Sequence, residues 1–321
     1  MEKQITQLQE LLDNRVLANE PLSKYTTFKI GGPAKYFFVA ENNEDLVRAV
    51  TYAKRFKIPF YLLGGGSNVL VSDDGYNGLV VLLKSNDIII KDTKVVCDSG
   101  VNLMTLVNKT IEAGLSGLEW AAGIPGTVGG AIRGNAGAYG GQMSDNLVGV
   151  EIMRGSKQFI LNKEQIKFGY RDSLFKHNSD VIITAEFKLA LGKEALGVEQ
   201  INKILKERKE KQPLEFPSAG CIFKNIPLEK IDDLKLFVLK NDPPKIYLER
   251  GKIPAAWLIE QLDLKGKKIG GAQVSDKHAN FIVNIGKATA SDVIQLISLI
   301  KTKVRDTFSL QLEEEIIYVG F

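Results

Sequence analysis

Apolar residues follow two spacings along the chain, one typical of helices and one typical of strands. Helical spacing predicts helices at 1–19, 44–57, 102–113, 199–211, 255–262 and 291–308. Short apolar or alternating runs predict strands at 36–40, 59–63, 78–83, 87–90, 94–98, 147–153, 157–161, 181–189, 268–274, 279–285 and 315–319. No internal repeat interrupts this mixture. The pattern therefore predicts an α+β fold.

Two glycine-rich stretches depart from both spacings. The first, 64–68, follows a predicted strand directly, and the second, 114–141, has neither a helical nor an alternating pattern. Glycine lets the backbone approach a ligand closely, and successive N–H groups in such turns form concavities that bind anions. Flexible linkers rarely carry Trp, Ile, Val and Pro at the density of 114–141. We therefore predict a packed cradle for a phosphate-bearing cofactor. The dinucleotide fingerprint G-x-G-x-x-G fails at Val69, which disfavours a Rossmann domain.

Composition excludes several classes of protein. The chain has 321 residues, 44% hydrophobic and 25% charged, with a net charge of +4. It has no dense basic tract, so nucleic-acid binding is disfavoured, while an anionic small molecule suits the charge. No apolar run is long enough to span a bilayer, and the N-terminus has no signal-peptide core, so we expect a cytoplasmic protein without membrane insertion. The two cysteines and two histidines have no metal-ligand spacing, and we expect no metal.

Six motifs in fixed order resemble one known family. They lie at 64–70, 123–130, 135–140, 168–173, 219–225 and 312–316. Together they resemble the UDP-N-acetylenolpyruvoylglucosamine reductases of peptidoglycan synthesis, over about 21–320. Between Tyr170 and Tyr247 there is no tyrosine, so the chain resembles the compact variety that lacks the tyrosine-loop insertion.

The resemblance implies a PCMH-type (vanillyl-alcohol-oxidase-like) two-lobed FAD-binding domain and a smaller α+β C-terminal substrate-binding domain. On this basis 1–21 is an N-terminal helix and 22–191 is the FAD domain, with lobes at about 22–84 and 85–191. Residues 192–321 form the substrate-binding domain, and we allow for the last strand returning to the FAD domain.

The resemblance also implies the chemistry. The family uses FAD and NADPH to reduce UDP-N-acetylglucosamine enolpyruvate to UDP-N-acetylmuramate, a step in peptidoglycan precursor synthesis and so in cell shape and division. Arg171 is implied to hold the substrate carboxylate and favour the enolate, and Glu315 to polarise the enol or relay a proton. Cys221 replaces the family's usual serine proton donor. A thiol, with a pKa of about 8.5, is still mostly protonated near neutral pH and can donate.

Each of these residues also has a simpler interpretation. Arg171 could form a surface pair with Asp172, Glu315 could be an exposed charge at a strand end, and Cys221 could be a structural cysteine. The motif matches favour the catalytic roles.

The remaining site residues are carried over from the motifs. The predicted cofactor-binding residues are Gly64, Gly65, Gly66, Ser67, Asn68, Gly123, Ile124, Pro125, Gly126, Gly129, Gly130 and Ala138. The predicted substrate-binding residues are Tyr170, Lys211, Lys224, Asn225 and His278. His278 could equally be a packing histidine. The family usually has proline where this chain has Ile226, which puts the turn after Asn225 in doubt.

Other functions remain open at the level of the sequence. The main alternative is a flavin oxidase of the same superfamily, which differs in rapid reaction of its reduced flavin with oxygen. A non-catalytic nucleotide-sugar or flavin sensor is disfavoured because all three catalytic positions hold competent groups. The N-terminal half has no histidine, so we expect non-covalent FAD. We further expect a monomer whose small-molecule partners are NADPH and the nucleotide sugar.

Overall fold

The computed structural model describes residues 2–321, which form two compact units. Unit 1 comprises 2–20, Pro33–Gly65 and Tyr76–Glu210, and unit 2 comprises Pro21–Gly32, Gly66–Gly75 and Lys211–Phe321. The glycine turn at 64–68 is therefore shared, with two residues in unit 1 and three in unit 2. The domain boundaries expected from the sequence stay a prediction.

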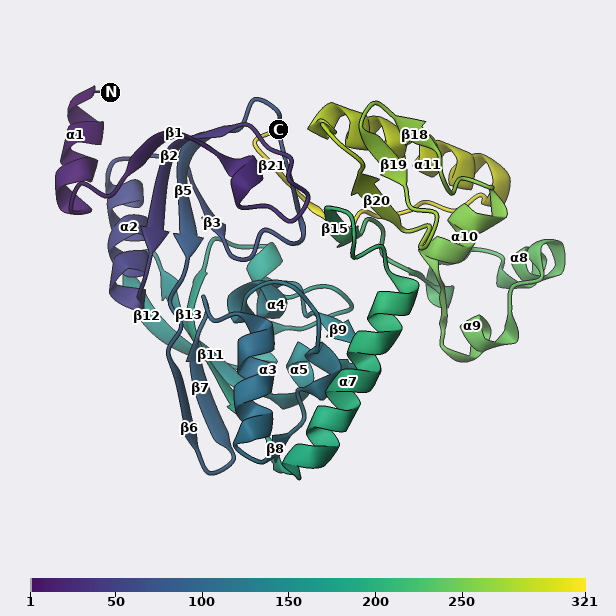
Figure 1. Ribbon diagram of the computed structural model, residues 1–321, viewed down its shortest axis with the longest axis horizontal. Coiled ribbons are helices and arrows are strands. Elements are labelled where there is room, and N and C mark those ends of the chain that lie inside the picture. The colour runs from purple at the N-terminus through teal and green to yellow at the C-terminus, as the bar shows by residue number, and fades with distance from the viewer. Residues whose placement is uncertain (1) are drawn as a thin grey trace. The chain divides into compact units, whose positions relative to one another are not determined.

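The first sheet of unit 1 is largely parallel, with strand order β1-β2-β5-β3. Its strands are β1 (Leu17–Pro21), β2 (Pro33–Ala40), β3 (Phe60–Leu63) and β5 (Tyr76–Leu83). Helix α2 (Asn43–Arg55) packs beside β2 (Figure 1), and Asn42 caps it by accepting a hydrogen bond from the Asp45 N–H at 2.8 Å. Helix α1 (Glu2–Leu11) adds Leu8 to the same core.

The second sheet of unit 1 is antiparallel, with strand order β12-β11-β13-β7-β6. Its strands are β6 (Ile88–Lys91), β7 (Lys94–Asp98), β11 (Leu147–Arg154), β12 (Lys157–Asn162) and β13 (Val181–Lys188). Helices α3 (Leu103–Glu112), α4 (Val128–Arg133) and α7 (Glu194–Lys211) share its hydrophobic core. Ala185 lies opposite both Cys97 and Val150, and all three are buried, so the register places apolar groups on one face.

Short elements complete unit 1. Strand β8 (Leu115–Ser116) pairs with β14 (Ala190–Leu191), and β9 (Gly137–Ala138) pairs with β10 (Gly141–Gln142). The other short segments are the 3-10 turns η2 (Glu119–Ala121) and η3 (Leu174–Lys176) and the helices α5 (Met143–Asn146) and α6 (Lys163–Ile166).

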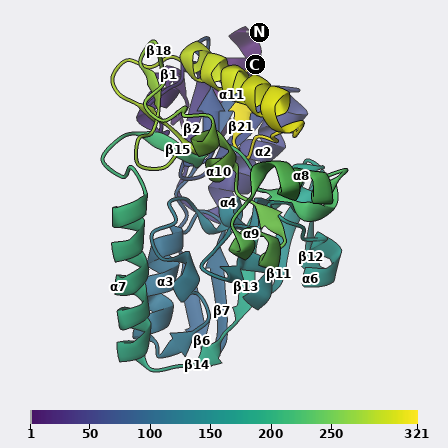
Figure 2. The ribbon, with the colours of Figure 1, turned by 90° about the vertical axis from the view of Figure 1, so that its right-hand side faces the viewer.

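Unit 2 has an antiparallel sheet of strand order β15-β20-β19-β18, backed by the long helix α11 (Ala290–Phe308). The strands are β15 (Ser218–Cys221), β18 (Lys268–Ile269), β19 (Ala272–Val274) and β20 (Phe281–Asn284). Figure 2 shows α11 along the sheet, with α10 (Ala255–Gln261) below it. Helix α11 buries one apolar stripe, which includes Val293, Leu296 and Ile300.

The other elements of unit 2 are short. Strand β21 (Ile317–Val319) runs parallel to β4 (Val69–Val71), and β16 (Ile226–Pro227) pairs with β17 (Lys252–Ile253). The remaining ones are η1 (Leu22–Lys24), η4 (Leu228–Lys230), α8 (Leu234–Asn241) and α9 (Lys245–Glu249).

Several predicted elements need correction. The helix predicted at 1–19 ends at Leu11 because Asp13 and Asn14 adopt positive φ, after which the chain enters β1. The strand predicted at 268–274 is a hairpin that turns at Gly270, where φ is 51°. The helix predicted from 199 begins at Glu194. The stretch 114–141, predicted without helical pattern, contains α4.

The α+β class is confirmed by the mixture of helices and sheets in each unit. None of the helices from residue 2 onward combines the length and the apolar content that a membrane crossing requires.

Candidate active site

The two glycine-rich stretches meet in unit 1, although they lie far apart in the sequence. A Cβ atom on Gly65 would stand 2.6 Å from the Gly126 Cα, closer than real side chains come. Gly129 packs in the same way against Ser99: a Cβ atom on Gly129 would stand 2.8 Å from the Ser99 Cβ. The Gly129 N–H donates a hydrogen bond to the Ser99 carbonyl at 2.8 Å. These positions need glycine because a side chain there would overlap atoms of Gly126 or Ser99.

A cavity of about 580 Å³ lies beside these turns, within the usual size range of ligand pockets. Arg133, at the end of α4, reaches it and donates a hydrogen bond to the Phe175 carbonyl. Burial lowers the pKa of Arg133, because removing the guanidinium from water disfavours its charged form. An anionic ligand would offset that cost. The polar residues and glycines that line the cavity include Tyr61, Gly64, Ser99, Thr127, Gly129, Gly130 and Arg133.

Ser99 contributes a hydroxyl group to this cavity. The residue is 1% exposed, and its Oγ has no hydrogen-bond partner among residues 2–321. A buried polar atom without a partner costs free energy, so the hydroxyl is poised for a ligand atom. Tyr61 lies on the same cavity, and burial raises the pKa of its phenol to about 12, so it stays a neutral hydroxyl donor.

Sequence reasoning missed these cavity residues. Arg133 is the one basic residue in 114–141, and that isolation in a glycine-rich stretch was a usable signal. Ser99 directly follows a predicted strand, but nothing in the sequence indicates that its hydroxyl lacks a partner. Of the predicted cofactor residues, Gly64, Gly129 and Gly130 line the cavity.

Gly65 and Gly126 form the contact beside the cavity, and the other predicted cofactor residues do not line it. Gly123, which precedes Ile124 and Pro125, would clash through a Cβ with Leu205 and Arg208 of α7. Gly66, Ser67 and Asn68 belong to unit 2.

Arg171 is hydrogen-bonded to the β9–β10 hairpin, which carries Ala138, and it also contacts the ring of Tyr170. The Arg171 Nη2 donates to the Gly137 carbonyl at 2.7 Å, and its guanidinium stands 5.6 Å from the centre of the Tyr170 ring. Arg171 has a φ of 55°, unusual for a residue with a side chain. The carboxylate of Asp172 hydrogen-bonds to His177 at 2.9 Å. The local backbone therefore directs the cation toward the hairpin.

Cys221 and Glu315 lie on adjoining segments of unit 2. Cys221 ends β15 opposite Phe281, and the next residue, Ile222, accepts a hydrogen bond from the Glu315 N–H at 2.7 Å. The Asn68 side chain donates to the Glu315 carbonyl at 3.1 Å, which brings the predicted cofactor turn to the same place. A thiol and a carboxyl group on neighbouring backbones can donate and relay a proton.

The two thiols differ in accessibility. Cys97 is 2% exposed, and burial raises the pKa of its thiol, so it is expected to be inert. Cys221 is partly exposed.

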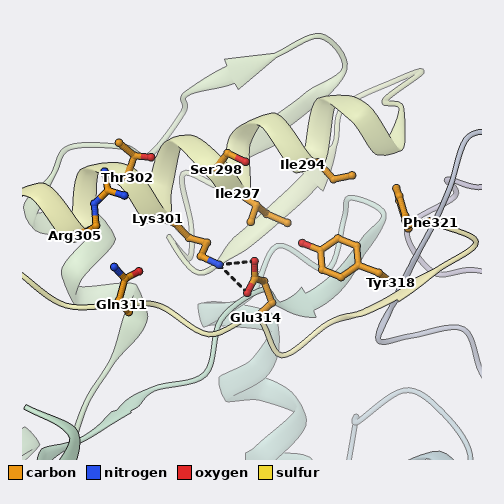
Figure 3. A pocket seen from close by; sticks show the side chains of 10 residues that line it. All are labelled: Ile294, Ile297, Ser298, Lys301, Thr302, Arg305, Gln311, Glu314, Tyr318 and Phe321. Carbon is orange, nitrogen blue, oxygen red and sulfur yellow. Dashed lines mark hydrogen bonds and ion pairs between the residues drawn. The ribbon is translucent and has the colours of Figure 1, made fainter.

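The three consecutive glutamates have different surroundings. Glu313 pairs with Lys230 at 2.7 Å and with Lys224 at 3.4 Å. Glu314 points into a groove of about 520 Å³ between α11 and the C-terminal segment, where it bonds Lys301 at 2.9 Å (Figure 3). Burial raises the pKa of Tyr318, in the same groove, to about 12. Glu313 and Glu314 thus form ion pairs with lysines on the surface of unit 2.

The other predicted substrate residues have clear local contacts. The Asn225 Oδ1 accepts from the Ala255 N–H at 3.2 Å, at the first residue of α10. The His278 ring packs 4.9 Å from Phe281, and its Nδ1 accepts from the Asn280 N–H at 3.3 Å. Burial lowers the pKa of His278, which favours a neutral ring. Lys211 is exposed at the end of α7.

The parallel lobe, the antiparallel lobe and the glycine turns of unit 1 define a flavoprotein of the FAD-binding class. A family model described as "FAD binding domain" matches residues 34–157. A second, described as "UDP-N-acetylenolpyruvoylglucosamine reductase, C-terminal domain", matches residues 212–319.

Full-length relatives agree with both matches. The chain is 38% identical over 319 residues to the UDP-N-acetylenolpyruvoylglucosamine reductase of Caldanaerobacter subterraneus subsp. tengcongensis, covering 98% of each chain. It is also 38% identical to the enzyme of that name from Clostridium botulinum strain 657, covering 98% of this chain and 96% of the relative. The crystal structure of UDP-N-acetylenolpyruvylglucosamine reductase (MurB) from Thermus caldophilus matches with a TM-score of 0.73 and 33% identity, over 95% of this chain and 98% of that one. The chain belongs to the UDP-N-acetylenolpyruvoylglucosamine reductase family.

It is therefore an FAD-dependent oxidoreductase, and the predicted PCMH-type fold is confirmed. The cavity of unit 1 fits this cofactor. The diphosphate of FAD requires hydrogen-bond donors and a cation. The cavity offers the hydroxyl groups of Ser99 and Tyr61 and the guanidinium of Arg133, beside glycines that leave room for a ligand.

Proposed function

We propose that the protein reduces UDP-N-acetylglucosamine enolpyruvate to UDP-N-acetylmuramate with electrons from NADPH. The observation that carries this proposal is the placement of a thiol, Cys221, and a carboxyl group, Glu315, on adjoining segments of the domain matched by the reductase family. Relatives with this enzyme name align with 98% of the chain, which supports the same assignment.

The residues have separate roles in the proposed reaction. Bound FAD supplies the hydride chemistry. When the terminal carbon of the enolpyruvyl group gains a hydride, the electron pair of the double bond moves to the neighbouring carbon and into the carboxylate. Arg171 holds that carboxylate and stabilises its charge. The Cys221 S–H protonates the neighbouring carbon, and the thiolate regains a proton from solvent, with Glu315 as hydrogen-bond partner or relay.

The binding residues form two proposed sets. For FAD we propose the predicted glycine-turn residues together with Ser99 and Arg133. For the nucleotide sugar we propose Tyr170, Lys211, Lys224, Asn225 and His278, of which the two lysines match its negative charge. We also propose that the protein acts as a monomer in the cytoplasm, where a reducing environment suits its thiols.

An anaerobic spectrum of the purified protein tests the proposal. The flavin band should bleach with NADPH and return when UDP-N-acetylglucosamine enolpyruvate is added. Bleaching without return, followed by rapid reoxidation in air, would instead identify an oxidase. A protein that neither contains nor takes up FAD would contradict the proposal altogether.

A further inference from the structure

The side chain of Asn280 is buried against the backbone that follows Cys221. Asn280 is 3% exposed and immediately precedes β20. Its Oδ1 accepts a hydrogen bond from the Phe223 N–H at 3.0 Å, and its Nδ2 donates to the Phe223 carbonyl at 2.8 Å. One amide side chain therefore satisfies both backbone groups of a residue that is itself 1% exposed.

The residue between Cys221 and Phe223 is tied on two sides. The Ile222 N–H donates to the Asn280 carbonyl at 2.8 Å, and the Ile222 carbonyl accepts from the Glu315 N–H at 2.7 Å. Asn280 thus makes three hydrogen bonds to 222–223, and the opposite side of the same segment holds Glu315. The segment that follows Cys221 is therefore held between Asn280 on one side and Glu315 on the other.

The regular sheet does not provide this support by itself. Strand β15 ends at Cys221, and its pairing with β20 is irregular between Ser218 and Cys221. Beyond that point the Asn280 side chain takes the place of a neighbouring strand's peptide group. A buried polar group that is fully bonded in this way fixes one arrangement of its surroundings.

We propose that Asn280 is a positioning residue that sets the place of the Cys221 thiol relative to Glu315. The inference rests on the proposed function, in which Cys221 donates the proton. Because Asn280 is buried and its side-chain amide hydrogen-bonds to both backbone groups of Phe223, it acts through 222–223 rather than on the substrate.

Asn284, the last residue of β20, offers a matched control. It is 7% exposed, donates to the Phe28 carbonyl at 3.1 Å, and accepts from the N–H groups of Gly286 and Ala288 at 2.9 and 3.2 Å. Removing either amide leaves buried backbone groups unpaired, so Asn280→Ala and Asn284→Ala should lose similar stability. The catalytic effects should differ, because Asn284 has none of these bonds to 222–223.

The experiment mixes the FAD-loaded, NADPH-reduced enzyme with increasing UDP-N-acetylglucosamine enolpyruvate under anaerobic conditions. For Asn280→Ala we expect the limiting rate of flavin reoxidation to fall by roughly 10- to 100-fold, since a small misplacement of reacting groups has an effect of that order. Flavin reduction by NADPH and the half-saturating substrate concentration should stay near wild type. Asn280→Asp, which keeps the acceptor for the Phe223 N–H, provides a second variant that preserves the side-chain shape, and should also be slowed.

A second measurement needs no substrate. Alkylation of Cys221 by iodoacetamide, followed by mass spectrometry, should be about tenfold faster or more in the Asn280 variants than in Asn284→Ala, because the thiol-bearing segment is released. If wild-type enzyme is not reoxidised by the substrate, the proposed function fails, while the alkylation rates still decide whether Asn280 positions the thiol. Asn280 variants that match Asn284→Ala in both measurements would overturn the inference.

Discussion

At the scale of single residues, burial decides which of several similar groups can react. Cys97 and Cys221 are both thiols, but Cys97 is enclosed in the core of the antiparallel sheet, where burial raises the pKa of its thiol. Glu313 and Glu314 are engaged by lysines, whereas the backbone of Glu315 is bonded to the segment that carries Cys221. Neighbours, rather than residue type, distinguish Cys221 and Glu315, the pair that we propose to be reactive, from the other thiol and the other two glutamates.

The guanidinium of Arg133 should contribute directly to FAD affinity. Hydrogen bonds to charged groups contribute about 1.5–3 kcal/mol, so Arg133→Gln should weaken FAD binding by roughly 10- to 100-fold. The dissociation constant is measured by titrating apoprotein into FAD and following flavin fluorescence. Arg305→Gln, which changes an exposed arginine paired with Asp306 on α11, is the control. Equal dissociation constants for the two variants would contradict the role of Arg133.

His278 should make stability depend on pH. Burial lowers the pKa of His278 below the ordinary value of 6.5, opposed by Glu260 and assisted by Lys265. Above about pH 6.5 the ring is neutral in both folded and unfolded chains; below it the unfolded chain gains a proton that the folded protein resists. The stabilisation from the neutral ring is therefore lost as pH falls through the lowered pKa.

His278→Asn removes this titration while its Oδ1 can still accept the Asn280 N–H. Urea unfolding at a series of pH values between about 7 and 5 should show a smaller decline for the variant than for wild type. Parallel declines would show that another group is responsible.

At the scale of elements, α11 shows how a sequence determines the start of a helix. Thr289 and Asp292 form a reciprocal capping box, with hydrogen bonds of 3.1 and 3.0 Å, and Asp292 also accepts from the Gly271 N–H at 3.1 Å. The hydrogen bond from the Thr289 backbone lowers the pKa of Asp292. The cap therefore joins the helix to the β18–β19 hairpin as well as starting it.

Removing this cap should destabilise unit 2 measurably. Thr289→Ala should cost about 1 kcal/mol of unfolding free energy, the usual effect of losing a threonine cap. Urea denaturation at saturating FAD measures the change, with Thr302→Ala in the exposed middle of α11 as the control. A loss no larger in Thr289→Ala than in Thr302→Ala would contradict the importance of the cap.

Most elements could be predicted because apolar spacing reflects local burial. Helices α2, α3 and α11 and most long strands were confirmed within a few residues of their predicted bounds. The prediction at 1–19 was wrong since Leu17 begins a strand beside β2, a tertiary contact that helical spacing does not reveal. Helix α4 was missed because its glycines are unfavourable in isolation, and it is built instead by packing against Ser99 and Val101.

At the scale of the whole molecule, the sequence allowed motif residues to be recognised but did not show which residues they contact in the fold. Gly65 and Gly126 were recognised from glycine patterns, and the structure brings them into contact. The importance of Ser99 and Asn280 depends on what distant segments place around them. The Ser99 hydroxyl has no hydrogen-bond partner among the described residues, whereas the side-chain oxygen and nitrogen of Asn280 are both bonded to Phe223. Such properties become visible only when the fold is known.

Removal of FAD should lower the stability of the protein. A ligand that binds only the folded chain stabilises it by about 2.7 kcal/mol when its free concentration is about 100 times the dissociation constant. Calorimetry should therefore show a higher melting temperature for the loaded protein than for the apoprotein. Riboflavin, which lacks the diphosphate expected beside Arg133, should raise it much less. Equal effects of riboflavin and FAD would argue against a diphosphate site in unit 1.

The proton donor is the most direct test of the account. Wild type, Cys221→Ser and Cys221→Ala are each reduced anaerobically with NADPH and then mixed with UDP-N-acetylglucosamine enolpyruvate in a stopped-flow spectrometer. We expect equal flavin reduction in all three, retained substrate reduction in the serine variant, and reoxidation of the alanine variant slowed by about 100-fold or more, the usual contribution of a general acid. Reoxidation of Cys221→Ala at nearly the wild-type rate would contradict the assignment of Cys221 as the donor.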